Sequence, residues 1–112
     1  MTEISPELVA RCRTLGQQLG TAVVAFQMEP VNIDEGGNAP APDTPGRNEA
    51  IFAKYYQMEA AAKVKWQAQF GAELDAVCDA LAQSGTAPPI PPMDWDVQSM
   101  REISEILAVI TA

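Results

Sequence analysis

The fold is decided by the stretch RNEAIFAKYYQMEAAAKVKWQAQFGAELDAVCDALAQS, residues 47–84, which contains no proline and only one glycine. Its apolar residues recur every three or four positions, at Ile51, Tyr55, Met58, Ala62, Trp66, Phe70, Leu74, Val77 and Leu81. This period is that of an α-helix with one buried stripe. A continuous helix of this length would extend for about 57 Å at about 1.5 Å per residue, more than the diameter of a typical small domain.

The length of this predicted helix leaves two outcomes open. Either the helix bends or breaks near Gly71, or it projects and pairs with another copy of the chain. Phe52, Tyr56 and Val64 lie partly off the main stripe, which indicates a second buried face. We therefore favour a long helix that engages more than its own chain.

A second helix is predicted over residues 6–28. Ser5 can cap it, and Pro6 suits its first position. A heptad stripe follows, made of Leu8, Cys12, Leu15, Leu19, Ala22 and Phe26. Such a stripe predicts lengthwise packing against another helix, as in a coiled coil. Gly16 and Gly20 would allow a close approach, which would offset the roughly 1 kcal/mol that each glycine costs a helix.

A third helix is predicted over residues 95–111, with Asp94 or Asp96 as its cap and an apolar stripe. The stripe consists of Met100, Ile103, Leu107 and Ile110. The proline-rich residues 85–93 before it favour a connector over a docking peptide, because the nearest basic residue is Arg101.

Residues 29–46 hold four prolines and three glycines, which predicts a flexible loop. Strand-like alternation does not rise above noise. The sequence thus predicts a single all-α domain over residues 1–112, with three to four helices. We expect a helical bundle or hairpin that is completed by oligomerisation.

The net charge of the chain is −8 and its pI is about 4.3. Binding to a phosphate backbone needs a basic patch, so direct nucleic-acid binding is not expected. No stretch of about 18 apolar residues predicts a membrane span, and the N-terminal residues do not resemble a signal peptide. Cys12 and Cys78 lie on apolar helical faces, which predicts free thiols and a reducing, cytoplasmic location.

The chain contains no histidine, which removes the usual general base and most zinc sites. Phosphate-binding glycine loops and calcium loops are also missing from the sequence. The carboxylate pairs Glu102–Glu105 and Asp75–Asp79 do not align with the apolar stripes. We therefore expect no enzyme, no catalytic residues, no metal and no cofactor.

The function that these features favour is that of a small, acidic interaction protein, acting as an adaptor, an inhibitor or a scaffold. It would self-associate, as a dimer, and bind a protein partner, for which a basic surface would suit the acidity of the chain. The residues predicted to mediate association are Leu8, Leu15, Leu19, Ile51, Tyr55 and Trp66.

Two alternatives remain open. The first is a small-molecule binding protein whose pocket for an anionic ligand forms around Tyr55, Tyr56, Lys63 and Trp66, although the same residues would also suit an ordinary core with lysines beside it. The second is an acidic decoy that imitates nucleic acid and inhibits a nucleic-acid-binding protein, as small phage-encoded inhibitors do.

Overall fold

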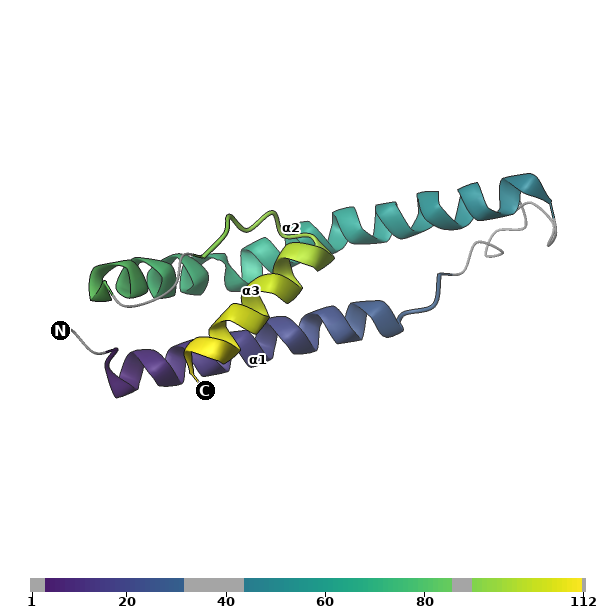
Figure 1. Ribbon diagram of the computed structural model, residues 1–112. Coiled ribbons are helices and arrows are strands. Elements are labelled where there is room, and N and C mark those ends of the chain that lie inside the picture. Colours follow the sequence, from purple (N-terminus) through teal and green to yellow (C-terminus); the bar gives the residue numbers. More distant parts are fainter. Residues whose placement is uncertain (1–3, 32–43, 86–89, 112) are drawn as a thin grey trace.

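A computed structural model describes residues 4–31, 44–85 and 90–111 and contains three helices (Figure 1). These are α1 (Pro6–Met28), α2 (Pro45–Ser84) and α3 (Val97–Ile110). The described residues include no strand, so the all-α prediction is confirmed. Most of the predicted loop 29–46 and part of the proline-rich connector lie outside the described residues.

The helices α1 and α2 run side by side in opposite directions, and α3 crosses them on one side (Figure 1). Two contacts fix this antiparallel register. The Arg11 guanidinium pairs with the Glu73 carboxylate near the start of α1, and the Phe26 ring packs on Tyr55 near its end. α3 packs mainly on α1 and reaches α2 through the backbone N–H of Val97, which donates to the Glu59 carboxylate at 3.3 Å.

α2 is a single helix that continues through Gly71. It begins at Pro45, earlier than the sequence predicts, because Thr44 takes the N-cap and proline suits the first helical position. It ends at Gly85, whose φ of 71° is the left-handed conformation that glycine adopts easily. Its 40 residues amount to about 60 Å at about 1.5 Å per residue, and the longest extent of the molecule is 62 Å.

The mismatch in length between α1 and α2 leaves part of α2 without a partner helix among the described residues. The contact of Phe26 with Tyr55 places the last turn of α1 beside Tyr55. Residues 45–54 therefore lie beyond the end of α1 (Figure 1). α2 therefore projects at this end without a break near Gly71. Pairing of the projecting part with another copy stays a prediction.

The core lies where the apolar stripes of the three helices meet. It includes the predicted stripe of α1, of which Ala22 is half-buried, and the apolar residues in the C-terminal half of α2. Its buried members are Leu8, Cys12, Leu15, Leu19, Val23, Phe26, Trp66, Phe70, Leu74, Val77, Leu81, Val97, Met100, Ile103 and Leu107. Cys12 is buried and Cys78 half-buried, and both are free thiols, as predicted. Burial raises the pKa of both thiols, so they stay protonated at neutral pH.

The two glycines of α1 serve the close crossing of α1 and α3. The Ser104 hydroxyl donates to the Gly16 carbonyl at 2.7 Å. A Cβ on Gly16 would lie 3.2 Å from the Cβ of Leu107, and one on Gly20 would lie 3.2 Å from the Ser104 hydroxyl. The predicted close approach therefore occurs within the chain, between α1 and α3.

Two carboxylates stabilise the beginning of α3. Asp96 is the N-cap, and its carboxylate accepts the backbone N–H of Ser99 at 2.8 Å. Glu59 accepts the N–H of Val97. Hydrogen bonds from the hydroxyl and backbone N–H of Ser99 lower the pKa of Asp96, with a smaller contribution from the charge of Lys63.

The residues before α3 pack against the core. Ile90, Met93 and Trp95 are half-buried there. Trp95 has a φ of 61°, which is unusual for a residue with a side chain. Its ring reaches to 3.8 Å from the position that a Cβ on Gly71 would take.

Gly16 and Gly71 provide a matched test of the α1–α3 crossing. Gly71→Ala should raise the free energy of unfolding by about 0.5–1 kcal/mol, because alanine favours the helix and the new Cβ meets only ordinary contacts at 3.8 Å. Gly16→Ala should leave the free energy of unfolding unchanged or lower it, because the new Cβ would press on Leu107 and on the backbone of α3. Urea denaturation of the two variants measures the difference. Equal stabilisation by both would show that α3 does not sit close to Gly16.

The lowered pKa of Asp96 makes stability depend on pH in a defined direction. A carboxylate with a lowered folded pKa stabilises the fold above its unfolded pKa, and this contribution is lost as pH falls through the folded pKa. Asp96→Ala should cost about 1 kcal/mol near neutral pH. Asp96→Asn should keep a capping oxygen but remove this pH dependence, so between about pH 6 and pH 2 it should lose less stability than the parent chain. Parallel acid titrations followed by circular dichroism would reveal the difference, and identical curves would contradict the role of Asp96.

Candidate protein-interaction groove

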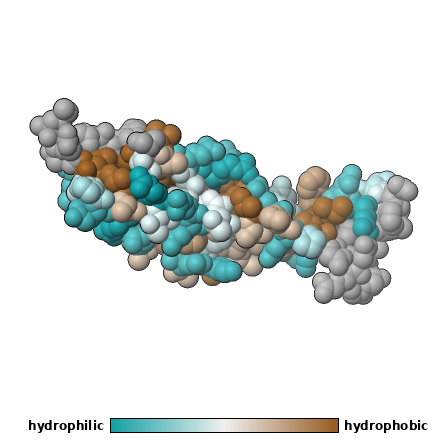
Figure 2. All heavy atoms as spheres, turned by 90° about the horizontal axis from the view of Figure 1, so that it is seen from below, coloured by the Kyte–Doolittle hydropathy of each residue, from teal (hydrophilic) through white to brown (hydrophobic). Residues whose placement is uncertain are grey.

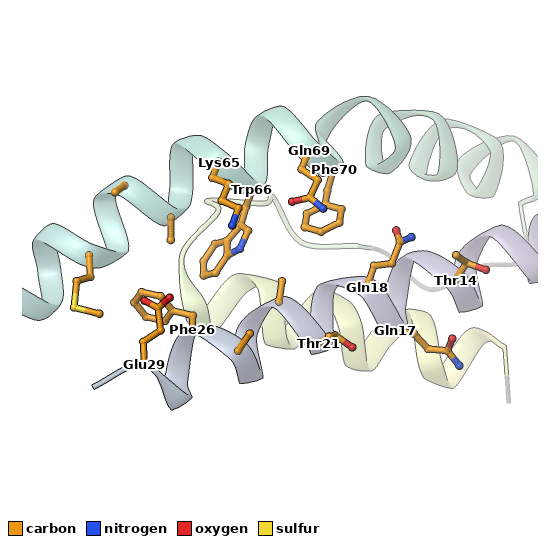
Figure 3. Close-up of a pocket in the computed structure, with 15 residues that line it drawn as sticks. Thr14, Gln17, Gln18, Thr21, Phe26, Glu29, Lys65, Trp66, Gln69 and Phe70 are labelled. Carbon is orange, nitrogen blue, oxygen red and sulfur yellow. The ribbon is translucent and has the colours of Figure 1, made fainter. Parts of the chain in front are cut away.

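The side of the α1–α2 pair that faces away from α3 holds an open groove with a volume of about 870 Å³ (Figure 3). The described residues that line it belong to α1, its C-cap and α2. They are Thr14, Gln17, Gln18, Thr21, Ala22, Ala25, Phe26, Glu29, Met58, Ala61, Ala62, Lys65, Trp66, Gln69 and Phe70. The groove exists because α3 covers the helix pair on one side only.

Aromatic rings form the floor of this groove. The Phe26 ring meets the rings of Tyr55 and Trp66 edge to face, with 5.5 Å between centroids in each pair. Such pairs contribute about 0.5–1.5 kcal/mol each beyond the burial of their area. Trp66 and Phe70 point from α2 towards α1 (Figure 3). The rings thus hold the end of α1 against α2 and give the groove an apolar base.

Small side chains widen the groove in its middle. Ala22 and Ala25 come from α1, and Ala61 and Ala62 from α2. Alanines allow the backbone of a bound helix to come close, as in helix-in-groove recognition. The shape of the groove therefore suits a helix better than a compact small molecule.

The rim of the groove is almost uncharged. Residues 14–28, TLGQQLGTAVVAFQM, contain no Asp, Glu, Lys or Arg. Lys65 and Glu29 are the charged residues among those that line the groove. Large apolar groups on the same helix are open to solvent, since Val24 is 53% and Met28 78% exposed. In the view from the α1 side, brown and pale residues interrupt the hydrophilic surface (Figure 2).

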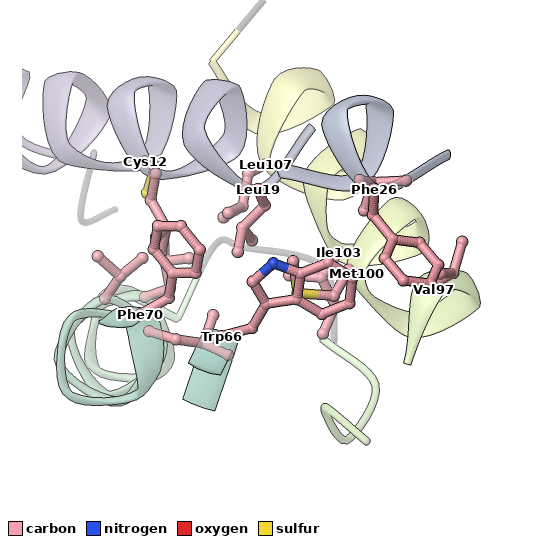
Figure 4. Close-up of a cluster of buried hydrophobic side chains, with 14 of the residues drawn as sticks. Cys12, Leu19, Phe26, Trp66, Phe70, Val97, Met100, Ile103 and Leu107 are labelled. Carbon is pink, nitrogen blue, oxygen red and sulfur yellow. The ribbon is translucent and has the colours of Figure 1, made fainter. Parts of the chain in front are cut away.

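The structure separates the six residues predicted to mediate association into two groups. Leu8, Leu15, Leu19 and Trp66 are buried within the chain, where Leu19 and Trp66 point into the cluster between the helices (Figure 4). Ile51 and Tyr55 are half-buried in the N-terminal part of α2. Their role in association stays a prediction.

The four residues of the predicted ligand pocket do not gather around one cavity. Tyr55 and Tyr56 lie together, 5.9 Å between ring centroids, and line a hollow of about 680 Å³. Trp66 instead lies at the floor of the α1–α2 groove, and the charge of Lys63 helps to lower the pKa of Asp96. The ionisable side chains that line the hollow besides the two tyrosines are Glu59, Asp96, Arg101 and Glu102. Three carboxylates against one guanidinium do not favour an anionic ligand.

The outward-facing residues of α1 were not among the predicted site residues. Gln17 and Thr21 point away from α2, whereas Gln18 points towards it (Figure 3). The absence of charge over residues 14–28 was the available signal, because an exposed helix of an acidic protein ordinarily carries charged side chains.

Within residues 4–31, 44–85 and 90–111, no three side chains that could hold a metal ion are grouped together. None of the helices described is long and apolar enough to cross a membrane. The groove is therefore the feature from which we argue function.

Comparisons of the chain with protein-family models, with curated proteins and with solved structures find no match. The fold and the groove define the described part of the chain as an all-helical arrangement of three helices with an open groove between α1 and α2.

The aromatic floor can be tested by truncating Phe26, which is 8% exposed. Phe26→Ala should lower the free energy of unfolding by about 3–5 kcal/mol, as other buried phenylalanines do. Phe52→Ala is the matched control, because Phe52 is 59% exposed and its truncation should change stability by less than about 0.5 kcal/mol. Equal effects in urea denaturation would show that Phe26 does not hold α1 against α2.

Proposed function

We propose that the chain is a small, acidic, non-catalytic interaction protein that self-associates into a dimer and binds a macromolecular partner as an adaptor, inhibitor or scaffold. The observation that carries this proposal is the open α1–α2 groove, with its aromatic floor and its uncharged rim. The proposal does not assign any reaction to the chain.

The composition around the groove supports association. The buried centres of protein interfaces are depleted in charged residues and enriched in aromatic residues and methionine. The groove combines the rings of Phe26, Trp66 and Phe70 with Met58, and the exposed Met28 lies on the same helix as Phe26. These features are those of an interface centre on a chain whose net charge is −8.

The acidic faces of the chain favour a partner with a basic surface. Glu102 and Glu105 on α3 are exposed, as are Asp75 and Asp79 on α2. Fields of one sign steer oppositely charged partners and raise the rate of association. A dimer would present these faces twice, and the two free thiols fit a cytoplasmic location.

Solution mass tests the self-association directly. Light scattering over a wide concentration range should give a mass near twice the 12.0 kDa of the chain, falling towards one chain on dilution. A mass of one chain up to high micromolar concentration would contradict the proposal. Binding to a basic protein should weaken as salt rises, because screening acts over about 8 Å at physiological ionic strength.

A further inference from the structure

The geometry points to the outer face of α1, defined here as Gln17, Thr21, Val24 and Met28, as the surface on which a second copy of the chain docks. We infer that the two α1 helices lie antiparallel, with their outer faces packed against each other. This inference rests on the proposed self-association and specifies its interface and orientation.

The outer face of α1 forms a second regular stripe. Its residues recur at spacings of four, three and four, and its C-terminal half is apolar, with Val24 53% and Met28 78% exposed. The first stripe, from Leu8 to Phe26, is buried within the chain. Among the described residues, the inner face of α1 is packed against α2 and α3, whereas Val24 and Met28 on the outer face are exposed.

The outer face of α1 is a ridge between two grooves. The α1–α2 groove lies on one side, and a second groove of about 790 Å³ lies on the other, between α1 and α3. Gln17, Thr21 and Ala25 line both grooves. The ridge protrudes from the chain, and the same ridge of a second copy can pack against it about a twofold axis, so that both copies use the same surface.

Charge favours this face over the exposed apolar patch on α3. Two copies with a net charge of −8 each repel one another unless their contact is free of carboxylates. The exposed Val109 shares its hollow with Glu102 and Glu105. The outer face of α1 carries no charge over four turns, so it allows the closest approach of two copies at the lowest electrostatic cost.

The charges that flank this face set the orientation. Arg13 precedes the uncharged residues 14–28, and Glu29 follows them. In an antiparallel pair centred on Thr21, Arg13 of each copy lies at the same level along the helix axis as Glu29 of the other. A parallel pair would bring like charges together, and the helix dipoles would also repel. Charge complementarity therefore favours a second copy in the antiparallel orientation.

Thr21→Glu tests the centre of this interface. Thr21 is exposed in the single chain, so the variant should fold normally, but the dimer would bring two carboxylates together at its axis. We expect the dissociation constant to rise by about a hundredfold or more, because an unpaired buried charge is strongly unfavourable. Ala76→Glu is the matched control, since Ala76 is an exposed helical residue outside the groove and gains the same charge. It should leave the dimer intact.

Charge reversal tests the orientation. Glu29→Arg and Arg13→Glu should each weaken the dimer by about tenfold, because each turns two attractions across the axis into repulsions. The double variant should restore it. Arg13 also donates to the Thr111 carbonyl at 3.1 Å, so Arg13→Glu can disturb the end of α3. If it does, the result for Glu29→Arg decides the test. Failure of the double variant to recover would overturn the antiparallel pairing.

The outcomes separate this inference from the proposed function. A chain that is monomeric without any substitution defeats both. A dimer that survives Thr21→Glu but is lost in Phe52→Glu defeats only the α1 interface, because association then occurs through the projecting part of α2. Circular dichroism and melting temperature should match the parent chain in every variant used.

Discussion

The close crossing of α3 over α1 is the constraint on which the rest of the structure depends. Gly16 admits the backbone of α3, and the Ser104 hydroxyl fixes the crossing by its bond to the Gly16 carbonyl. α3 has only 14 residues and lies on one side of the helix pair. The other side of α1 and α2 therefore has no helix of the described chain to cover it, and the groove follows from the crossing.

The length of α2 adds a second consequence. α1 has 23 residues and α2 has 40, so about 25 Å of α2 exceeds α1 at about 1.5 Å per residue. Isolated helices are marginal in water unless an apolar face is packed. The N-terminal half of α2 is held by the contact of Phe26 with Tyr55 and by the hydrogen bond that the backbone N–H of Val97 donates to the Glu59 carboxylate. These contacts end near Tyr55, and Phe52 beyond them is exposed.

Local patterns in the sequence predicted the helices well, whereas contacts between distant residues were harder to predict. The spacing from Leu8 to Phe26 marks the buried side of α1, and the sequence alone shows that Gly16 and Gly20 permit a close neighbour. It does not show whether that neighbour is α3 or another copy. The residues of the predicted pocket do not line one cavity, for a geometric reason. The backbone positions of Tyr55 and Trp66 are about 16 Å apart along the axis of α2. The Phe26 ring packs against both of their rings, so they do not meet in one cavity and line separate hollows.

The uncharged face of α1 also bears on how such a surface persists in an acidic protein. Lysine, glutamate and arginine form helices about as readily as glutamine, so charges over residues 14–28 would not weaken α1. They would also raise solubility. The cost of charge there arises only when the face loses its water, because a buried charge without a partner is strongly destabilising. A face that is exposed in the single chain yet free of charge for four turns is therefore best explained by the desolvation that accompanies binding.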